Sequence, residues 1–205
     1  MVAPKWGEHC VQTVKAYLKL TVYPPHGPIK LCLATHNPHL TMTLRFKPSV
    51  TVAAVIERDG RFLLVEEMTP EGLRLNNPAG HLEPGESPAQ GCAREALEET
   101  AHDFEPTELV GIYLSRFQRP QTDGTVEDIT YLRFTFCGRL GPLQPHRQLD
   151  EGIVRTVWMT PDEIRASAAR HRSPLVVRCM EDYLRGQRYP LALVSTDPSV
   201  QALQG

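Results

Sequence analysis

The sequence predicts an α/β protein in which helices cover both faces of a mixed β-sheet, an α/β/α sandwich. Two apolar, β-branched runs precede a glutamate-bearing helix at about 88–101, and three further runs follow it. Helical segments then close the chain. Strands on both sides of a central helix, followed by closing helices, are typical of layered α/β domains. A chain of 205 residues can build one such domain with a substantial core.

The first two strands are predicted at 51–57 and 61–67, where apolar and β-branched residues dominate. Arg58-Asp59-Gly60 separates them, and Asp-Gly between two such runs is a strong hairpin signal. Residues 68–79 are expected to form a loop that leads to the helix.

The helix has a clear start signal. Ser87 is the expected N-cap, Pro88 suits the first helical position, and Gln90 completes a capping box. At 100° per residue, small residues share one face that can pack closely against a sheet. These small residues are Ala89, Cys92, Ala93, Ala96 and Thr100.

The opposite side of this helix is acidic. Glu95, Glu98 and Glu99 fall within an arc of roughly 100°. Carboxylates three and four residues apart repel one another, and a bound divalent cation removes that penalty. Hard cations such as Mg²⁺ prefer oxygen ligands and keep water and substrate phosphates in the other positions. A solvated acidic face is the alternative, and for an arbitrary glutamate-rich helix it is the commoner one.

The spacing of the charged residues favours the metal site. Gly80, Glu86, Arg94 and the three glutamates form the pattern G-x5-E-x7-R-E-x-x-E-E. A chance match anywhere in the chain is on the order of one in a hundred thousand. The segment therefore resembles the Nudix box of the Nudix hydrolases.

The box departs from that family at three positions. The family usually has glycine and an aliphatic residue where this chain has Ala101 and His102, and an aliphatic residue where Ala96 stands. These positions pack or cap the helix, and none is an expected metal ligand. The departures therefore bear on local geometry more than on chemistry.

After the box, strands are predicted at 109–117 and 129–140, joined by a polar loop at 118–128, and a short strand at 154–159. A helix is expected to start after the N-cap Thr160, with proline at its first position.

A last helix is predicted from Ser173-Pro174 to about Leu184, ending near Gly186.

The two ends of the chain differ in composition from the domain between them. Residues 1–45 contain five Lys and Arg against one acidic residue and are expected to be a disordered or weakly ordered leader. The domain is assigned to 46–191, and residues 192–205 are expected to be a flexible tail.

Motifs outside the box are similar to those of the NudJ-type phosphatases of bacteria, over about residues 46–191. The motifs read FKP at 46–48, VEE at 65–67, NPAGHLE at 77–83, RSPLV at 172–176 and GQRYPL at 186–191. The resemblance implies a Nudix-type α/β/α sandwich and a Mg²⁺-dependent hydrolase, with Mn²⁺ as an alternative ion. It implies action on nucleoside di- and triphosphates and on hydroxymethylpyrimidine diphosphate, with release of orthophosphate.

The same resemblance assigns roles within the box. Glu98 and Glu99 bind the metal directly, and a backbone carbonyl at Ala79 or Gly80 completes that side. Glu95 is a further ligand or the base that orients water. The catalytic set also includes Arg94, which is expected to pair with Glu86 or Glu98 and hold the carboxylates in place.

Several other residues are candidates with open alternatives. His81, Arg133 and Tyr131 are candidate substrate contacts, although a strand arginine is more often structural; Arg188 and Tyr189 are similarly ambiguous. An extra carboxylate from outside the box has three candidates, Glu127, Asp128 and Glu151. Gly91 leaves room for phosphate or is a tolerated poor helix former.

The composition of the chain also bears on its functional class and its surroundings in the cell. A net charge of −2 and five scattered cysteines give no sign of polymeric nucleic-acid binding, a disulfide framework or a zinc site. No apolar run reaches the length of a membrane span. The expected protein is cytoplasmic, a monomer or homodimer, acting on a small phosphoanhydride. The alternatives are a nucleotide-sensing Nudix domain without turnover and an ADP-ribose or dinucleotide pyrophosphatase.

Overall fold

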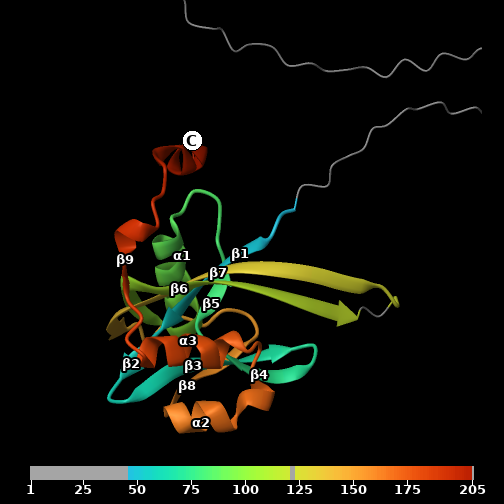
Figure 1. The fold of residues 1–205 in the computed structure, drawn as a ribbon. Helices are drawn as coiled ribbons and strands as arrows, with labels where there is room; N and C mark the ends of the chain where they lie inside the picture. The colour runs from blue at the N-terminus through green and yellow to red at the C-terminus, as the bar shows by residue number, and fades with distance from the viewer. Residues whose placement is uncertain (1–45, 121–122, 205) are drawn as a thin grey trace, which may run out of the picture. The chain divides into compact units, whose positions relative to one another are not determined.

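The computed structural model describes residues 46–120 and 123–204, so the predicted leader at 1–45 lies outside the described residues (Figure 1). The strands are β1 Ser49–Val55, β2 Glu57–Arg58, β3 Arg61–Thr69, β4 Gly72–Asn76, β5 Ala79–His81, β6 His102–Pro120, β7 Val126–Leu143, β8 Ile153–Met159 and β9 Tyr189–Pro190. The α-helices are α1 Pro88–Thr100, α2 Pro161–Ala166 and α3 Leu175–Leu184. Short 3-10 turns lie at Ala168–Arg170, Leu191–Leu193 and Pro198–Gln204.

The strands form two sheets. The five-stranded sheet has the order β5-β1-β7-β6-β9, and the other sheet joins β2, β3 and β4 with β8, which pairs with β3. β1 and β7 run parallel, whereas β5, β6 and β9 pair antiparallel with their neighbours. The predicted mixed pairing is therefore confirmed, with the strands divided between two sheets.

Strand β1 separates two hydrophobic cores. Val52 and Ala54 pack into one core with Cys92 of α1. Val55 points to the other core, where Val176 of α3 lies. Because strand side chains alternate between faces, α1 and α3 cover opposite faces, as the predicted α/β/α sandwich requires (Figure 1).

The predicted hairpin is confirmed at Asp59-Gly60. Both residues have positive φ, 53° and 74°, as a two-residue turn of this type requires. Glu57 pairs with Phe62 across the turn, and its carboxylate accepts a hydrogen bond from the Gly60 N–H at 2.7 Å.

Two predicted loops were wrong. Residues 68–79 contain β4, which pairs with β3 from Val65–Asn76 to Thr69–Gly72. Most of 118–128 also belongs to strands, because β6 and β7 continue their pairing to Pro120–Val126. The ends of β6 and β7 are polar and are stabilised by cross-strand pairs such as Arg116 with Asp128. β4 is only five residues long, and Leu73 and Leu75 are its apolar residues.

Helix α1 has the predicted start. The Ser87 hydroxyl accepts from the Gln90 N–H, and the Gln90 side chain accepts from the Ser87 N–H. The helix ends at Ala101, whose φ of 56° is left-handed and whose N–H donates to Leu97 O. Alanine thus takes the conformation that glycine usually supplies at a helix end.

The closing helices also follow their signals. Thr160 forms a capping box with Glu163 at the start of α2. The Ser173 hydroxyl accepts from the Leu175 N–H at the start of α3, and Gly186, with φ 78°, follows its end. Flexibility of the 192–205 tail stays a prediction. Within the described ranges, no helix is long and apolar enough to cross a membrane.

Candidate active site

Arg94 organises the acidic face of α1. It donates to Glu86 at 2.8 and 3.0 Å, to Glu95 at 2.8 Å and to Glu98 at 2.9 Å. It also donates to the His81 carbonyl at 2.9 Å, which ties α1 to the end of β5. The predicted pairing with Glu86 or Glu98 is confirmed for both. Because one guanidinium holds three carboxylates, each is fixed in position before any ligand binds.

Two glycines make room for these carboxylates. A Cβ on Gly80 would lie 2.2 Å from the carboxyl group of Glu95, so a side chain at this position would displace it. A Cβ on Gly91 would lie 2.6 Å from the Glu86 carboxylate. Gly91 therefore accommodates Glu86, which explains it better than either alternative drawn from the sequence.

Glu95 and Glu99 do not form a solvated face, because each is only 8% exposed. The Glu99 carboxylate accepts a hydrogen bond from the Ala79 N–H at 2.8 Å. Burial raises the pKa of Glu99 to about 8, and repulsion from Glu95, Glu67 and Asp150 adds to this rise. Burial also raises the pKa of Glu95, opposed in part by Arg94.

This carboxylate set fits a hard divalent cation. In the part of the chain that the structure describes, no three acidic, His or Cys side chains are already arranged as a metal-binding group. The donors nevertheless suit Mg²⁺ or Mn²⁺, since carboxylate oxygens are their preferred protein ligands. A bound cation would stabilise the charged form of Glu99, which burial disfavours. Glu95, Glu98 and Glu99, the ligands predicted from the sequence, stay the candidates to hold it.

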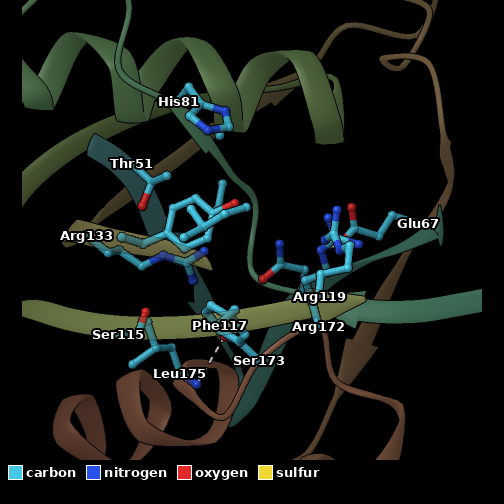
Figure 2. Close-up of a pocket in the computed structure, with 15 residues that line it drawn as sticks. Thr51, Glu67, His81, Ser115, Phe117, Arg119, Arg133, Arg172, Ser173 and Leu175 are labelled. Carbon is cyan, nitrogen blue, oxygen red and sulfur yellow. Dashed lines mark hydrogen bonds and ion pairs between the residues drawn. The ribbon is translucent and has the colours of Figure 1, made fainter. Parts of the chain in front are cut away.

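A cavity of about 250 Å³ opens beside β5, next to the carboxylates (Figure 2). The residues that line it come from five-stranded-sheet strands, from β3 and β4, and from the start of α3. They are Thr51, Glu67, Asn76, Ala79, Gly80, His81, Ser115, Phe117, Arg119, Ile129, Tyr131, Arg133, Arg172, Ser173 and Leu175.

The sheet register brings the predicted substrate residues together. Thr51 pairs with His81 on one side and with Arg133 on the other, and Tyr131 pairs with Ser115. The Tyr131 ring lies 6.2 Å from the His81 ring, centre to centre. His81, Tyr131 and Arg133 therefore line one cavity, beside the residues predicted to hold the metal.

Comparisons with known proteins agree with this geometry. The family model of the NUDIX domain matches residues 45–179. The chain belongs to the Nudix family. It is accordingly a hydrolase of phosphorus-containing acid anhydrides, and its box helix is α1.

The relatives include curated enzymes and solved structures. Phosphatase NudJ of Escherichia coli strain K12 is 38% identical over 149 residues, which are 73% of this chain and 92% of the relative. Phosphatase NudJ of Shigella flexneri matches to the same extent. The structure of a NUDIX hydrolase from Nitrosomonas europaea is 55% identical, with a TM-score of 0.66, and covers 74% of this chain and 98% of its own.

Two of the carboxylates proposed from outside the Nudix box, Glu127 and Asp128, lie near arginines of β6. Asp128 bonds with Arg116 at the β6–β7 hairpin, and Glu127 lies 4.0 Å from Arg119. Glu151 is exposed, whereas its neighbour Asp150 donates its N–H to the Glu98 carbonyl at 3.1 Å.

The ambiguous pair of the closing motif lies elsewhere. Arg188 stacks on the Tyr183 ring at 3.6 Å and donates to the Tyr183 carbonyl. Tyr189 belongs to β9 and pairs with Leu109. Both arrangements are structural contacts, and neither residue lines the cavity beside the Nudix box.

Sequence reasoning missed several residues of the Nudix site. Glu67, Phe117, Arg119 and Arg172 line the cavity, and Asp150 lies near the carboxylates. The VEE and RSPLV motifs contain Glu67 and Arg172 and were the available signal. Phe117 and Arg119 had none, because no motif contains Phe117, the last residue of a predicted strand, and Arg119 stands in a predicted loop.

Proposed function

We propose that this protein is a Mg²⁺-dependent phosphatase that removes the terminal phosphate of small diphosphates and triphosphates and releases orthophosphate. The proposed substrates are nucleoside di- and triphosphates and hydroxymethylpyrimidine diphosphate. The observation that carries this proposal is the set of carboxylates at the edge of a polar and aromatic cavity, with Glu95 and Glu98 held by Arg94 and Glu99 buried. The 38% identity to Phosphatase NudJ supports the phosphatase assignment.

Each charged residue of the Nudix box has its own role in the proposed reaction. When bound, a divalent cation neutralises phosphate oxygens and lowers the pKa of a water molecule. Arg94 keeps Glu95 and Glu98 from turning away from the site, since it donates to both. Glu99 must give up its proton before it can act as a ligand, because its pKa is raised to about 8. Glu95 is positioned to orient water or to ligate.

The cavity binds the substrate in the proposed reaction. Its wall contains Arg119 and Arg172, which attract an anionic substrate. Its aromatic residues Tyr131 and Phe117, with ring centres 5.8 Å apart, offer flat surfaces to a ring. Holding the substrate in this cavity places its phosphates toward the β5 end, where the carboxylates lie.

The test is a substrate panel with product identification. Wild-type protein with Mg²⁺ or Mn²⁺ is incubated with nucleoside di- and triphosphates, hydroxymethylpyrimidine diphosphate, ADP-ribose and a dinucleotide. We expect orthophosphate from the diphosphates, and none in the Glu99→Gln variant. Pyrophosphate from triphosphates alone would overturn the phosphatase assignment. Cleavage of ADP-ribose or the dinucleotide in preference would assign another Nudix activity, and binding without hydrolysis would indicate a sensor.

We further propose a cytoplasmic enzyme that acts as a monomer or homodimer on small molecules. The cysteines within the described ranges, Cys92, Cys137 and Cys179, are free thiols and buried. Free thiols suit a reducing compartment.

A further inference from the structure

The cavity floor carries polar atoms whose hydrogen-bonding capacity is unused. Thr51 Oγ1, Glu67 Oε1, Asn76 Oδ1, Ser115 Oγ and both Nε and Nη1 of Arg133 are buried and find no hydrogen-bond partner among the described residues. All five residues line the same cavity. Folded proteins pair nearly all buried polar atoms, so a concentration of unpaired ones in one cavity indicates a ligand.

These atoms lie on two walls of the cavity. Thr51, Ser115 and Arg133 stand on one face of the β1, β6 and β7 strands, where Thr51 pairs with Arg133. Glu67 and Asn76 stand on the β3–β4 hairpin, in which Asn76 pairs with Val65, two residues before Glu67. Figure 2 shows Glu67 on the side of the cavity opposite Thr51 and Ser115.

The chemistry of the two walls differs. The guanidinium of Arg133 can only donate, whereas Asn76 Oδ1 and Glu67 Oε1 accept. Glu67 Oε1 lies 3.6 Å from Arg172 Nε, an ion pair that leaves its hydrogen-bonding capacity unused. A phosphate group offers acceptors alone, so it satisfies Arg133 but is repelled by Glu67 and leaves Asn76 unpaired. An edge that carries both an N–H donor and a nitrogen or carbonyl acceptor satisfies both walls.

We propose that this cavity binds a nitrogen heterocycle of the nucleobase type by its edge, with Arg133 donating to a ring acceptor and Glu67 accepting from a ring N–H. Arg133 and Glu67 are then specificity-determining residues of the proposed phosphatase, on whose function this proposal rests. The diphosphate extends toward Ala79 and Gly80, which line the cavity next to the Nudix carboxylates.

The size and shape of the cavity agree with this ligand. Its volume of about 250 Å³ accommodates a single heterocycle with part of a linked sugar. Tyr131 and Phe117 pack edge to face, which leaves an aromatic surface toward the cavity. Base–aromatic contacts tolerate any base, so selection among bases falls to the polar atoms of the floor.

Arg133 offers a way to separate binding from structure. A buried cation with unpaired N–H groups stabilises the fold little, so an apolar residue of similar length is expected to be tolerated. Arg133→Met should therefore leave the melting temperature unchanged or raise it. A structural arginine would show the opposite, a clear fall in melting temperature.

The experiment measures binding and turnover with and without the ring. Cytidine monophosphate and ribose 5-phosphate are titrated into metal-free protein, and cytidine diphosphate and ribose 5-diphosphate are compared as substrates. We expect wild type to prefer the ring-bearing member of each pair. In Arg133→Met this preference falls about ten- to hundredfold. The Kd of ribose 5-phosphate and the kcat/KM of ribose 5-diphosphate stay within about twofold of the wild-type values. Glu67→Gln is expected to change the ranking among adenosine, cytidine, guanosine and uridine monophosphates.

Arg116→Met is the matched control, because Arg116 lies on the same strand as Ser115 and is paired with Asp128. An equal loss for both members of each pair in Arg133→Met would assign Arg133 to phosphate and overturn the proposal. So would a wild-type protein that binds ribose 5-phosphate as tightly as cytidine monophosphate. Failure to hydrolyse any diphosphate would count against the proposed function alone, since the metal-free titrations test the ring site independently.

Discussion

The acidic face of α1 and the floor of the neighbouring cavity are both buried and polar, but they are satisfied differently. On α1, Arg94 donates to Glu86, Glu95 and Glu98, and the Ala79 N–H donates to Glu99. On the cavity floor, Arg133 and Glu67 keep atoms without a hydrogen-bond partner among the residues described. The acidic face is thus organised by the protein itself, whereas the floor is left for a ligand to complete.

The two regions therefore suit different roles in one enzyme, positioning a cation and selecting a substrate. Groups that position a cation must hold their geometry before substrate arrives, and contacts within the protein provide that. Groups that select a substrate contribute most when the wrong ligand leaves them unpaired. Changes on α1 should therefore affect turnover of every substrate, whereas changes on the floor should affect the choice among substrates.

The largest expected effect is at Glu99. Glu99→Gln keeps the size of the side chain but removes a charge that should contact the cation, which costs several kcal/mol, or about a thousandfold in rate. Glu98→Gln is expected to behave likewise. Turnover measured against Mg²⁺ concentration checks both. Glu163→Gln, which keeps a cap acceptor at the start of α2, should change little. Wild-type turnover in both box variants at all Mg²⁺ concentrations would refute the metal assignment.

Gly80 gives the next largest effect. Gly80→Ala places a Cβ 2.2 Å from the Glu95 carboxyl group and must displace it. We expect a loss of about ten- to a hundredfold in kcat for all substrates, because small misplacements of catalytic groups are costly.

A double-mutant cycle with Glu95→Asp tests this cause. The shorter carboxylate leaves room for the new methyl group, so the two losses should not add. Additive losses would mean that Gly80 acts through another neighbour.

A third effect is expected on the stability of the metal-free protein and not on turnover. The pKa of Glu99 lies at about 8 in the folded protein, above its ordinary value of 4.5, so the folded state binds more protons between these pH values. The free energy of unfolding therefore falls as pH rises through this window, by up to about 1.4 kcal/mol per pH unit from this group. Glu99→Gln removes this contribution.

Urea unfolding in the presence of a chelator checks this slope. The variant should match wild type near pH 5 and be more stable than wild type near pH 8.5. Parallel pH profiles for the two proteins would show that Glu99 titrates normally.

The same contrast explains how far the sequence could predict the structure. The box lies within one turn and one helix, so its spacing gave Arg94, the three glutamates and the start at Ser87 directly. The cavity floor is assembled by register between strands distant in sequence, as in the pairing of Thr51 with Arg133. Arg133, Tyr131 and His81 were found as candidates, but Ser115 and Glu67 could not be placed before that register was known.

The prediction of secondary structure failed mainly where strands are short or polar. The ends of β6 and β7 have few apolar residues, and the alternation in β4 is limited to Leu73 and Leu75. Pairing to a neighbouring strand makes all of these segments strands. This kind of context overrides local propensity. Arg119 was missed for that reason, since it stands on the continuation of β6, whereas Phe117 ended a predicted strand and no motif singled it out.

The most direct test of the acidic face is calorimetric titration of Mn²⁺ and Mg²⁺ into substrate-free protein at pH 7, in two buffers of different ionisation enthalpy. Because Glu99 should hold a proton under these conditions, wild type is predicted to release close to one proton as the ion binds. Glu99→Gln is predicted to bind at least about tenfold more weakly and to release less. Equal affinity and equal proton release in the two proteins would contradict the assignment of Glu99 to the metal.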